Sequence, residues 1–304
     1  MIEVTNVSKW YGNLQALKNI SFSIKESEIV GFLGPNGAGK TTAMRVITGY
    51  FLPNTGDVKI GDYSMEDEPK KAKALLGYLP ENPPLYPEMP VVDYLNFVAR
   101  LNGVAKKDLK NRIDYVISKT NLYEKYNSKI RTLSKGLKQR VGIAAALIHD
   151  PKVIILDEPT IGLDPIQIIE IRNLIKEIGK EKTIILSSHI LAEIEEISSR
   201  VIIINKGEII AEDTTDNLRK KLQPDRLFSV KISEDLDISE YILSVKGVKQ
   251  CEKSHDEYHI RTEDLPSIQA NITRAIVEKG YSILEVRELE LSLEEIFAKL
   301  VKGE

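Results

Sequence analysis

The stretch Gly34-Pro-Asn-Gly-Ala-Gly-Lys-Thr-Thr42 carries the most specific pattern in the chain. It fits the phosphate-binding loop pattern G-x-x-x-x-G-K-[ST], which joins a buried strand to the start of a helix. The run Glu28-Ile-Val-Gly-Phe-Leu33 before it predicts that strand, and residues 41–48 after it predict the helix. The alternative is a glycine-rich turn with a chance lysine, but the flanking segments favour the phosphate loop.

The glycines of this loop let successive backbone N–H groups point into one concavity, which forms an anion-binding nest at a helix N-terminus. Lys40 is placed to reach the β- and γ-phosphates of a nucleotide, and the Thr41 hydroxyl to coordinate Mg²⁺. The predicted nucleotide-binding residues of the loop are Gly34, Pro35, Asn36, Gly37, Ala38, Gly39, Lys40, Thr41 and Thr42. The loop alone indicates a nucleotide without specifying its base.

Two carboxylates follow another buried strand, because the apolar residues 153–156 end in Asp157 and Glu158. A strand tip beside a phosphate loop is where a second acid must lie to help hold Mg²⁺, so we expect Asp157 in that role. Glu158 is then placed to polarise a water for attack on the γ-phosphate. The alternative is an ordinary Asp-Glu turn after a strand.

His189 ends a third predicted strand, Thr183-Ile-Ile-Leu-Ser-Ser-His189, whose last three residues are polar. Parallel strands end at the same edge of a sheet, so this histidine is expected near the two carboxylates. It is therefore a candidate to contact the γ-phosphate or to orient the attacking water. The alternative is a structural histidine.

The composition is that of a globular protein of about two domains, with 304 residues, 42% hydrophobic and 29% charged. A net charge of −3 gives no basic field, so nucleic acid is not indicated as a partner. A single cysteine, Cys251, excludes an internal disulfide framework. No apolar run is long enough to cross a membrane, and the N-terminus lacks a signal-peptide pattern. We expect a cytoplasmic chain whose role at a membrane depends on a partner.

The residue patterns change near residues 221–226, which predicts two domains, 1–222 and 223–304. The first alternates continuous Ile/Val/Leu runs with helical segments, as parallel strands buried on both faces do. The second has the order β-α-β-β-α-β, which predicts a small α+β ferredoxin-like domain. It ends in an amphipathic helix at residues 292–301, with Ser292 and Glu295 as a capping box. That helix either packs on its own domain or serves dimerisation or regulatory docking.

A further anion-binding helix start is indicated before the Asp157 strand, where Ser134 is a helix N-cap and Gly136 permits close approach. Together these motifs are similar to those of the ATP-binding subunits of ABC transporters. Leu133-Ser-Lys-Gly-Leu137 resembles the signature motif of that family, Gly162-Leu-Asp-Pro165 its D-loop and His189 its switch histidine. Tyr11 matches the aromatic residue that stacks on adenine. The resemblance covers residues 1 to about 220.

The resemblance implies an α/β fold, a P-loop ABC cassette with a mixed sheet core and a helical subdomain. It implies an ATPase with ATP and Mg²⁺, in which two copies of the chain, or one copy and a paralogous cassette, close head to tail. Ser134 and Gly136 would then complete the γ-phosphate site of the other subunit. Closure would drive a polytopic permease, which would hold the chain on the cytoplasmic face of the membrane.

Two features depart from the usual family pattern. Glu81 occupies the position of the Q-loop glutamine, where it can still reach Mg²⁺ or its waters but adds a negative charge. The signature motif has Lys135 and Leu137 in place of glycine and glutamine. These differences, with the second domain, resemble the ABC-2 branch of drug and polymer exporters, which includes gliding-motility ATPases.

Three functions compete at this point. For a transporter subunit, the resemblance implies that the proline-rich segment after Glu81 and the helix from Val91 contact the permease, with Tyr86, Val92 and Tyr94 as apolar contacts. The alternative is a helical subdomain surface with no partner. A soluble ABC-type ATPase acting on nucleic acid or ribosomes usually joins two cassettes or carries long coiled coils, whereas this chain has one cassette and no long heptad run.

A GTP switch needs an N-K-x-D element. Asn205-Lys-Gly-Glu208 only approaches this pattern, because its fourth residue is glutamate.

Overall fold

The computed structural model describes residues 1–188, 190–223, 225–234, 236–263, 265, 267–289 and 292–302. The chain divides into two compact units, Met1–Thr214 and Thr215–Glu304. The predicted boundary, between residues 222 and 223, lies at the other end of helix α8 (Thr215–Leu222). This helix therefore groups with the second unit, whereas the sequence pattern assigns it to the first.

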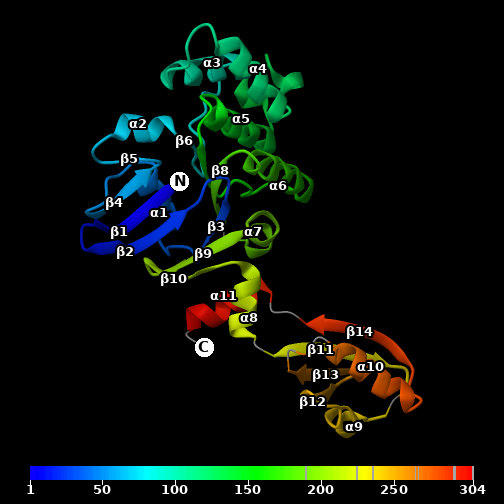
Figure 1. Cartoon of the computed structure of the whole chain (residues 1–304). Coiled ribbons are helices and arrows are strands. Elements are labelled where there is room, and N and C mark those ends of the chain that lie inside the picture. The colour runs from blue at the N-terminus through cyan, green and yellow to red at the C-terminus, as the bar shows by residue number, and fades with distance from the viewer. Residues whose placement is uncertain are drawn as a thin grey trace. The chain divides into compact units, whose positions relative to one another are not determined.

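Two sheets form the first unit (Figure 1). The strands of the first sheet are β1 (Ile2–Tyr11), β2 (Leu14–Ile24), β4 (Thr55–Ile60) and β5 (Tyr63–Ser64). The strands of the second are β3 (Ile29–Leu33), β6 (Leu76–Leu79), β7 (Val153–Asp157), β8 (Thr183–Ser188), β9 (Arg200–Asn205) and β10 (Glu208–Asp213). The first sheet is antiparallel, in the order β2-β1-β4-β5. The second has the order β10-β9-β3-β8-β7-β6 and is parallel except for β10, which confirms the predicted mixed sheet.

The helices of this unit are α1 (Lys40–Ile47), α2 (Pro69–Ala74), α3 (Val91–Leu101), α4 (Leu109–Lys119), α5 (Lys135–Leu147), α6 (Pro165–Gly179) and α7 (Leu191–Ile197), with short 3₁₀ turns at Tyr123–Lys125 and Ile130–Thr132. Helices α3, α4 and α5 pack on one another (Figure 1) and form the expected helical subdomain. In the described residues, no helix is long and apolar enough to span a membrane.

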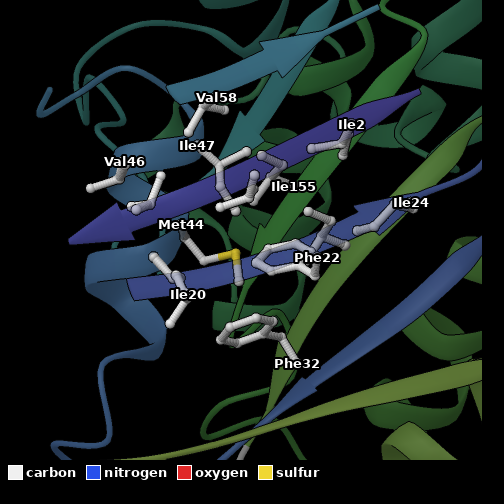
Figure 2. Packing of buried hydrophobic residues seen from close by; sticks show 14 of the residues in the cluster. Ile2, Ile20, Phe22, Ile24, Phe32, Met44, Val46, Ile47, Val58 and Ile155 are labelled. Atoms are coloured by element: carbon white, nitrogen blue, oxygen red, sulfur yellow. The ribbon is translucent and has the colours of Figure 1, made fainter. Parts of the chain in front are cut away.

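The main core of this unit lies where α1 packs between the two sheets. Figure 2 shows Met44 and Ile47 of α1 among Phe22 of the antiparallel sheet and Phe32 and Ile155 of the parallel sheet. All five side chains are buried. The helix that follows the phosphate loop is therefore fixed on both sides, which holds the loop in one position.

A core truncation tests this packing. Leu17 of β2 is fully buried, so Leu17→Ala should lower the free energy of unfolding of the first unit by about 2–5 kcal/mol. Leu101 is 70% exposed, and Leu101→Ala should change it by less than about 0.5 kcal/mol. The only tryptophan, Trp10, lies in β1, so its fluorescence in a denaturant titration reports this unit. Equal midpoints for the two variants would contradict the described core.

The second unit has the predicted ferredoxin-like order. Its elements are α8, β11 (Arg226–Ile232), α9 (Ser239–Leu243), β12 (Val248–Ser254), β13 (Glu257–Thr262), α10 (Ile268–Glu278), β14 (Ile283–Leu289) and α11 (Leu293–Lys302). The sheet is antiparallel, in the order β12-β13-β11-β14. Cys251 lies in its core, where burial raises the pKa of the thiol to about 11.

The last helix begins as the sequence predicts. The Glu295 carboxylate accepts a hydrogen bond from the Ser292 amide at 2.8 Å, and the Ser292 hydroxyl accepts one from the Glu295 amide at 3.3 Å. These bonds form the capping box. Helix α11 contacts α8 of the same unit and Ile296 is buried, which favours packing on its own domain over a free docking face.

Candidate active site

The phosphate loop connects β3 to α1 and needs its glycines for two reasons. Gly37 and Gly39 have φ angles of 80° and 111°, a region that side chains other than glycine rarely occupy. Gly34 lies so close to β9 that an added Cβ would meet the carbonyl oxygen of Ile204 at 2.4 Å. The loop can therefore wrap closely around a ligand while its base stays packed on the sheet.

The side chain of Lys40, near the end of the phosphate loop, points back toward the first residues of that loop. Its Nζ donates a hydrogen bond to the Gly34 carbonyl at 2.8 Å and lies 3.8 Å from Oε1 of Glu158. Both side chains are buried. The ammonium group is thus already held among oxygen atoms at the position where phosphate oxygens are expected, beside the predicted catalytic carboxylate.

A cavity of about 840 Å³ opens over the loop. Its lining contains the predicted residues Tyr11, Pro35, Asn36, Gly37, Gly39, Lys40, Thr41, Thr42, Glu81 and Glu158. Gly34 and Ala38 belong to the same loop but do not line the cavity. The chain folds these residues, far apart in sequence, into one site of a size suited to a nucleotide.

Hydrogen bonds from β8 fix the two acids at the end of β7. The Ser187 hydroxyl donates to Oδ1 of Asp157 at 2.6 Å, and it accepts from the Glu158 amide at 3.0 Å. Glu158 has a φ of 50°, an unfavourable backbone conformation for a residue with a side chain. Such strain persists only where the surroundings hold it, and it is common at functional sites.

Asp157 fits a magnesium ligand. Burial raises the pKa of its carboxyl, the Ser187 hydroxyl opposes this rise, and the nearby carboxylates of Glu158 and Glu81 add to it. Its Oδ2 is buried and has no hydrogen-bond partner among the described residues. A cation would satisfy this oxygen and reduce the repulsion. The described residues contain no cluster of three ligating side chains.

Tyr11, at the end of β1, lines the cavity and is 39% exposed. The ring of Phe51 meets its edge with centroids 5.8 Å apart. The ammonium of Lys9 lies 5.9 Å from the Tyr11 ring centroid and donates to the Leu52 carbonyl at 2.6 Å. The ring is therefore braced and still accessible to a planar base.

The signature segment lies at the start of α5, away from this cavity. The Ser134 hydroxyl caps the helix by accepting from the Leu137 amide at 3.3 Å. A Cβ on Gly136 would meet Gln167 Oε1 at 2.5 Å, so a larger residue here would have to displace the flexible Gln167 side chain of α6. In the described structure, Ser134 and Gly136 do not line the 840 Å³ cavity. His189, the remaining predicted site residue, lies outside the described residues.

A second hollow, of about 680 Å³, lies between the core and the helical subdomain. Among the predicted partner contacts, Tyr86 and Tyr94 line it and Val92 does not. Tyr86 packs against Phe97 with ring centroids 5.6 Å apart, and the two rings are 51% and 36% exposed. This aromatic rim is an accessible apolar surface.

Sequence reasoning missed several residues of the site. Lys18, Lys206 and Gly207 line the nucleotide cavity because the β9–β10 turn packs on β2, where the Lys18 amide donates to the Gly207 carbonyl at 2.8 Å. In the sequence, Ser187 is only a polar residue near the end of a predicted strand, and nothing there indicates that it contacts Asp157 and Glu158. Its role depends on the pairing of Asp157 with Ser187 in adjacent strands.

Comparisons with known proteins agree with this geometry. The ABC transporter family pattern matches residues 17–161, and the C-terminal domain of DrrA1-3-like ATP-binding proteins matches residues 214–301. The bacitracin transport ATP-binding protein BcrA of Bacillus licheniformis is 34% identical over 313 residues, which cover 100% of this chain and 98% of that protein. The linearmycin resistance ATP-binding protein LnrL of Bacillus subtilis (strain 168) is 36% identical over 234 residues, covering 77% and 75%.

Among solved structures, the ATP-binding cassette MJ0796, dimeric in a post-hydrolysis state with ADP and Pi, matches with a TM-score of 0.64 and 28% identity over 70% of this chain and 98% of that one. The fold and the site define a P-loop ATPase. The relatives narrow the class: the chain belongs to the ABC transporter family, as one of its ATP-binding proteins that hydrolyse ATP to power transport. No comparison supports the alternative of an ATPase directed at nucleic acid or ribosomes.

Proposed function

We propose that the chain is the ATPase subunit of an exporter and that it works as a head-to-tail dimer on a separate polytopic permease. One observation carries this proposal: the phosphate loop, Tyr11, Glu81 and Glu158 line one cavity, while Ser134 and Gly136 do not. This arrangement supports the role that the family resemblance gives to Ser134 and Gly136, which is to complete the nucleotide site of a second chain.

Each residue then has a role in the bound state. Tyr11 stacks on adenine, and the loop amides and Lys40 bind the phosphates. Thr41 and Asp157 would hold Mg²⁺, with Glu81 reaching the ion or its waters; the ion neutralises charge on the phosphate oxygens. Glu158 takes a proton from the attacking water, and His189 contacts the γ-phosphate or orients that water. Ser134 and Gly136 act on the nucleotide of the second copy.

The transported cargo is proposed from the relatives. One is a bacitracin transport protein and another a linearmycin resistance protein. We therefore propose export of an antibiotic-like compound. The permease would hold the chain at the cytoplasmic face of the membrane, and it would dock on the aromatic rim of the 680 Å³ hollow.

Substitutions on this rim test the proposed docking. Tyr86→Ala removes an exposed ring that lines the hollow, whereas Tyr123→Ala removes a ring that is 61% exposed outside it. After affinity purification from native membranes, Tyr86→Ala should retain several-fold less of a co-purifying polytopic membrane protein than Tyr123→Ala. Basal ATP hydrolysis should be equal in both. Recovery of the chain with no membrane protein, in the wild type as well, would contradict the proposed function.

A further inference from the structure

A buried carboxylate on α7 connects two segments of the active site. Glu193 is 5% exposed, and its Oε2 accepts a hydrogen bond from the Thr160 hydroxyl at 2.5 Å. The same oxygen accepts from the Ser188 hydroxyl at 3.5 Å. Thr160 follows Glu158 by two residues, and Ser188 is the last residue of β8, next to position 189. Glu193 thus joins the two segments that carry the predicted catalytic side chains.

This arrangement is costly in free energy. A carboxylate withdrawn from water needs compensating partners, and in the described part of the chain no lysine or arginine forms an ion pair with Glu193. Two hydroxyl groups compensate it instead, one from Thr160 in the turn after β7 and one from Ser188 at the end of β8. An apolar side chain could fill this core position on α7, as isoleucine does at the buried positions 194 and 197. The placement of an acid here therefore points to a positional role.

The Thr160 segment holds Glu158 in its unfavourable conformation. The Ile161 amide donates to the Glu158 carbonyl at 3.2 Å, and the Leu163 amide donates to the Thr160 carbonyl at 3.2 Å. These bonds close a turn directly after Glu158, and Thr160 is its buried anchor, 3% exposed. Fixing the Thr160 hydroxyl fixes this turn, and the turn sets the direction of the Glu158 carboxylate.

Ser188 links the same acid to the other segment. Its hydroxyl accepts a hydrogen bond from the Ile190 amide at 3.0 Å, so the two neighbours of position 189 are joined. Hydroxyl-to-backbone bonds of this kind stabilise tight turns. A single carboxylate oxygen therefore acts on both segments.

We propose that Glu193 is a positioning residue for ATP hydrolysis, which sets the geometry of Glu158 through Thr160 and holds the end of β8 through Ser188. This inference rests on the proposed function, in which Glu158 activates the water. It predicts an effect on kcat rather than on nucleotide binding, because none of the three tied residues, Glu193, Thr160 and Ser188, lines the nucleotide cavity.

The test is steady-state ATP hydrolysis by the full chain with MgATP. Glu193→Ala and Thr160→Val should each lower kcat by about 10- to 100-fold, the range expected when a catalytic group is misplaced by about 1 Å, with KM changed by less than about twofold. The double variant should be no slower than Glu193→Ala alone, since both changes remove one hydrogen bond. Glu193→Gln and Thr160→Ser keep an acceptor and a donor, respectively, and should stay within a few-fold of the wild type.

Glu196→Ala is the matched control. It lies on the same helix, its side chain is 54% exposed, and it pairs with Arg172 at 3.0 Å. Its kcat should equal that of the wild type. If Glu193→Ala does not fold, the comparison of Thr160→Val with Thr160→Ser decides the question.

Wild-type kcat in Thr160→Val, or equal losses in kcat and ATP affinity, would overturn the inference. The Glu158→Gln variant distinguishes a failure of the proposed function from a failure of this inference. If Glu158→Gln hydrolyses ATP normally, the role of Glu158 is wrong; if it is inactive while Thr160→Val is fully active, only the role of Glu193 is wrong.

Discussion

Glu158→Gln should lower kcat for ATP hydrolysis by about 10²- to 10⁴-fold, the usual contribution of a general base. Glutamine has the same size, so it can occupy the buried position beside Lys40, but it cannot take a proton from water. ATP affinity should change little, because the phosphate loop is intact. A phosphate-release assay with MgATP gives kcat, and a fluorescent ATP analogue gives the affinity.

The matched control for this variant is Glu208→Gln. The Glu208→Gln substitution makes the same chemical change near the cavity, but Glu208 is exposed and pairs with Lys18 at 3.1 Å. This control should hydrolyse ATP at the wild-type rate. Wild-type hydrolysis by Glu158→Gln would show that another group activates the water.

Lys40→Met should weaken ATP binding by about 10- to 100-fold. A hydrogen bond to a charged group contributes about 1.5–3 kcal/mol, and about 1.4 kcal/mol corresponds to a factor of ten. Methionine fills most of the buried space but cannot bind phosphate. Its stem should keep the loop packed, so the unfolding midpoint reported by Trp10 should change much less than it does in Leu17→Ala.

Lys18→Met is the control for Lys40→Met, because it removes a positive charge from the same cavity but not from the phosphate loop. Lys18 lines the same cavity, but its ammonium pairs with Glu208 in an exposed position. We expect its loss to change ATP affinity by less than about threefold, the scale of exposed ion pairs. Equal weakening by the two variants would mean that the cavity binds ATP through its general charge rather than through the phosphate loop.

Local patterns predicted most of the fold. Helix α1 spans Lys40–Ile47, where the pattern predicts a helix over residues 41–48, and β7 contains the apolar run before Asp157. In both cases the signal lies within a few residues of the element itself. The second unit also follows its predicted order, because each strand and helix has its own periodicity.

Contacts between distant segments could not be predicted in this way. The ring of Phe51 braces Tyr11 only because the loop after α1 returns to the end of β1. Glu193 lies in a helical pattern that gives no sign of its partners on β8 and after β7. The division at Thr214 differs from the predicted one because α8 continues the helical pattern of the first unit in sequence but contacts α11 in space.

The shared site is the part of the proposal that needs a second copy of the chain. The atoms nearest to a Cβ added on Gly136 all belong to the flexible side chain of Gln167, which can turn away, so packing within one chain does not by itself demand glycine here. The role of Ser134 and Gly136 in a second copy rests on the family resemblance and on their absence from the described cavity lining. A measurement of assembly must decide it.

The most direct test is the molar mass of Glu158→Gln in solution, measured by light scattering after gel filtration with and without MgATP. Hydrolysis is blocked in this variant, so a closed dimer should accumulate. We predict the mass of one chain, 34.2 kDa, without nucleotide and twice that value with MgATP. Ser134→Arg should prevent the change, because a large side chain would block the second half of the site. A mass of one chain under saturating MgATP would contradict the shared site.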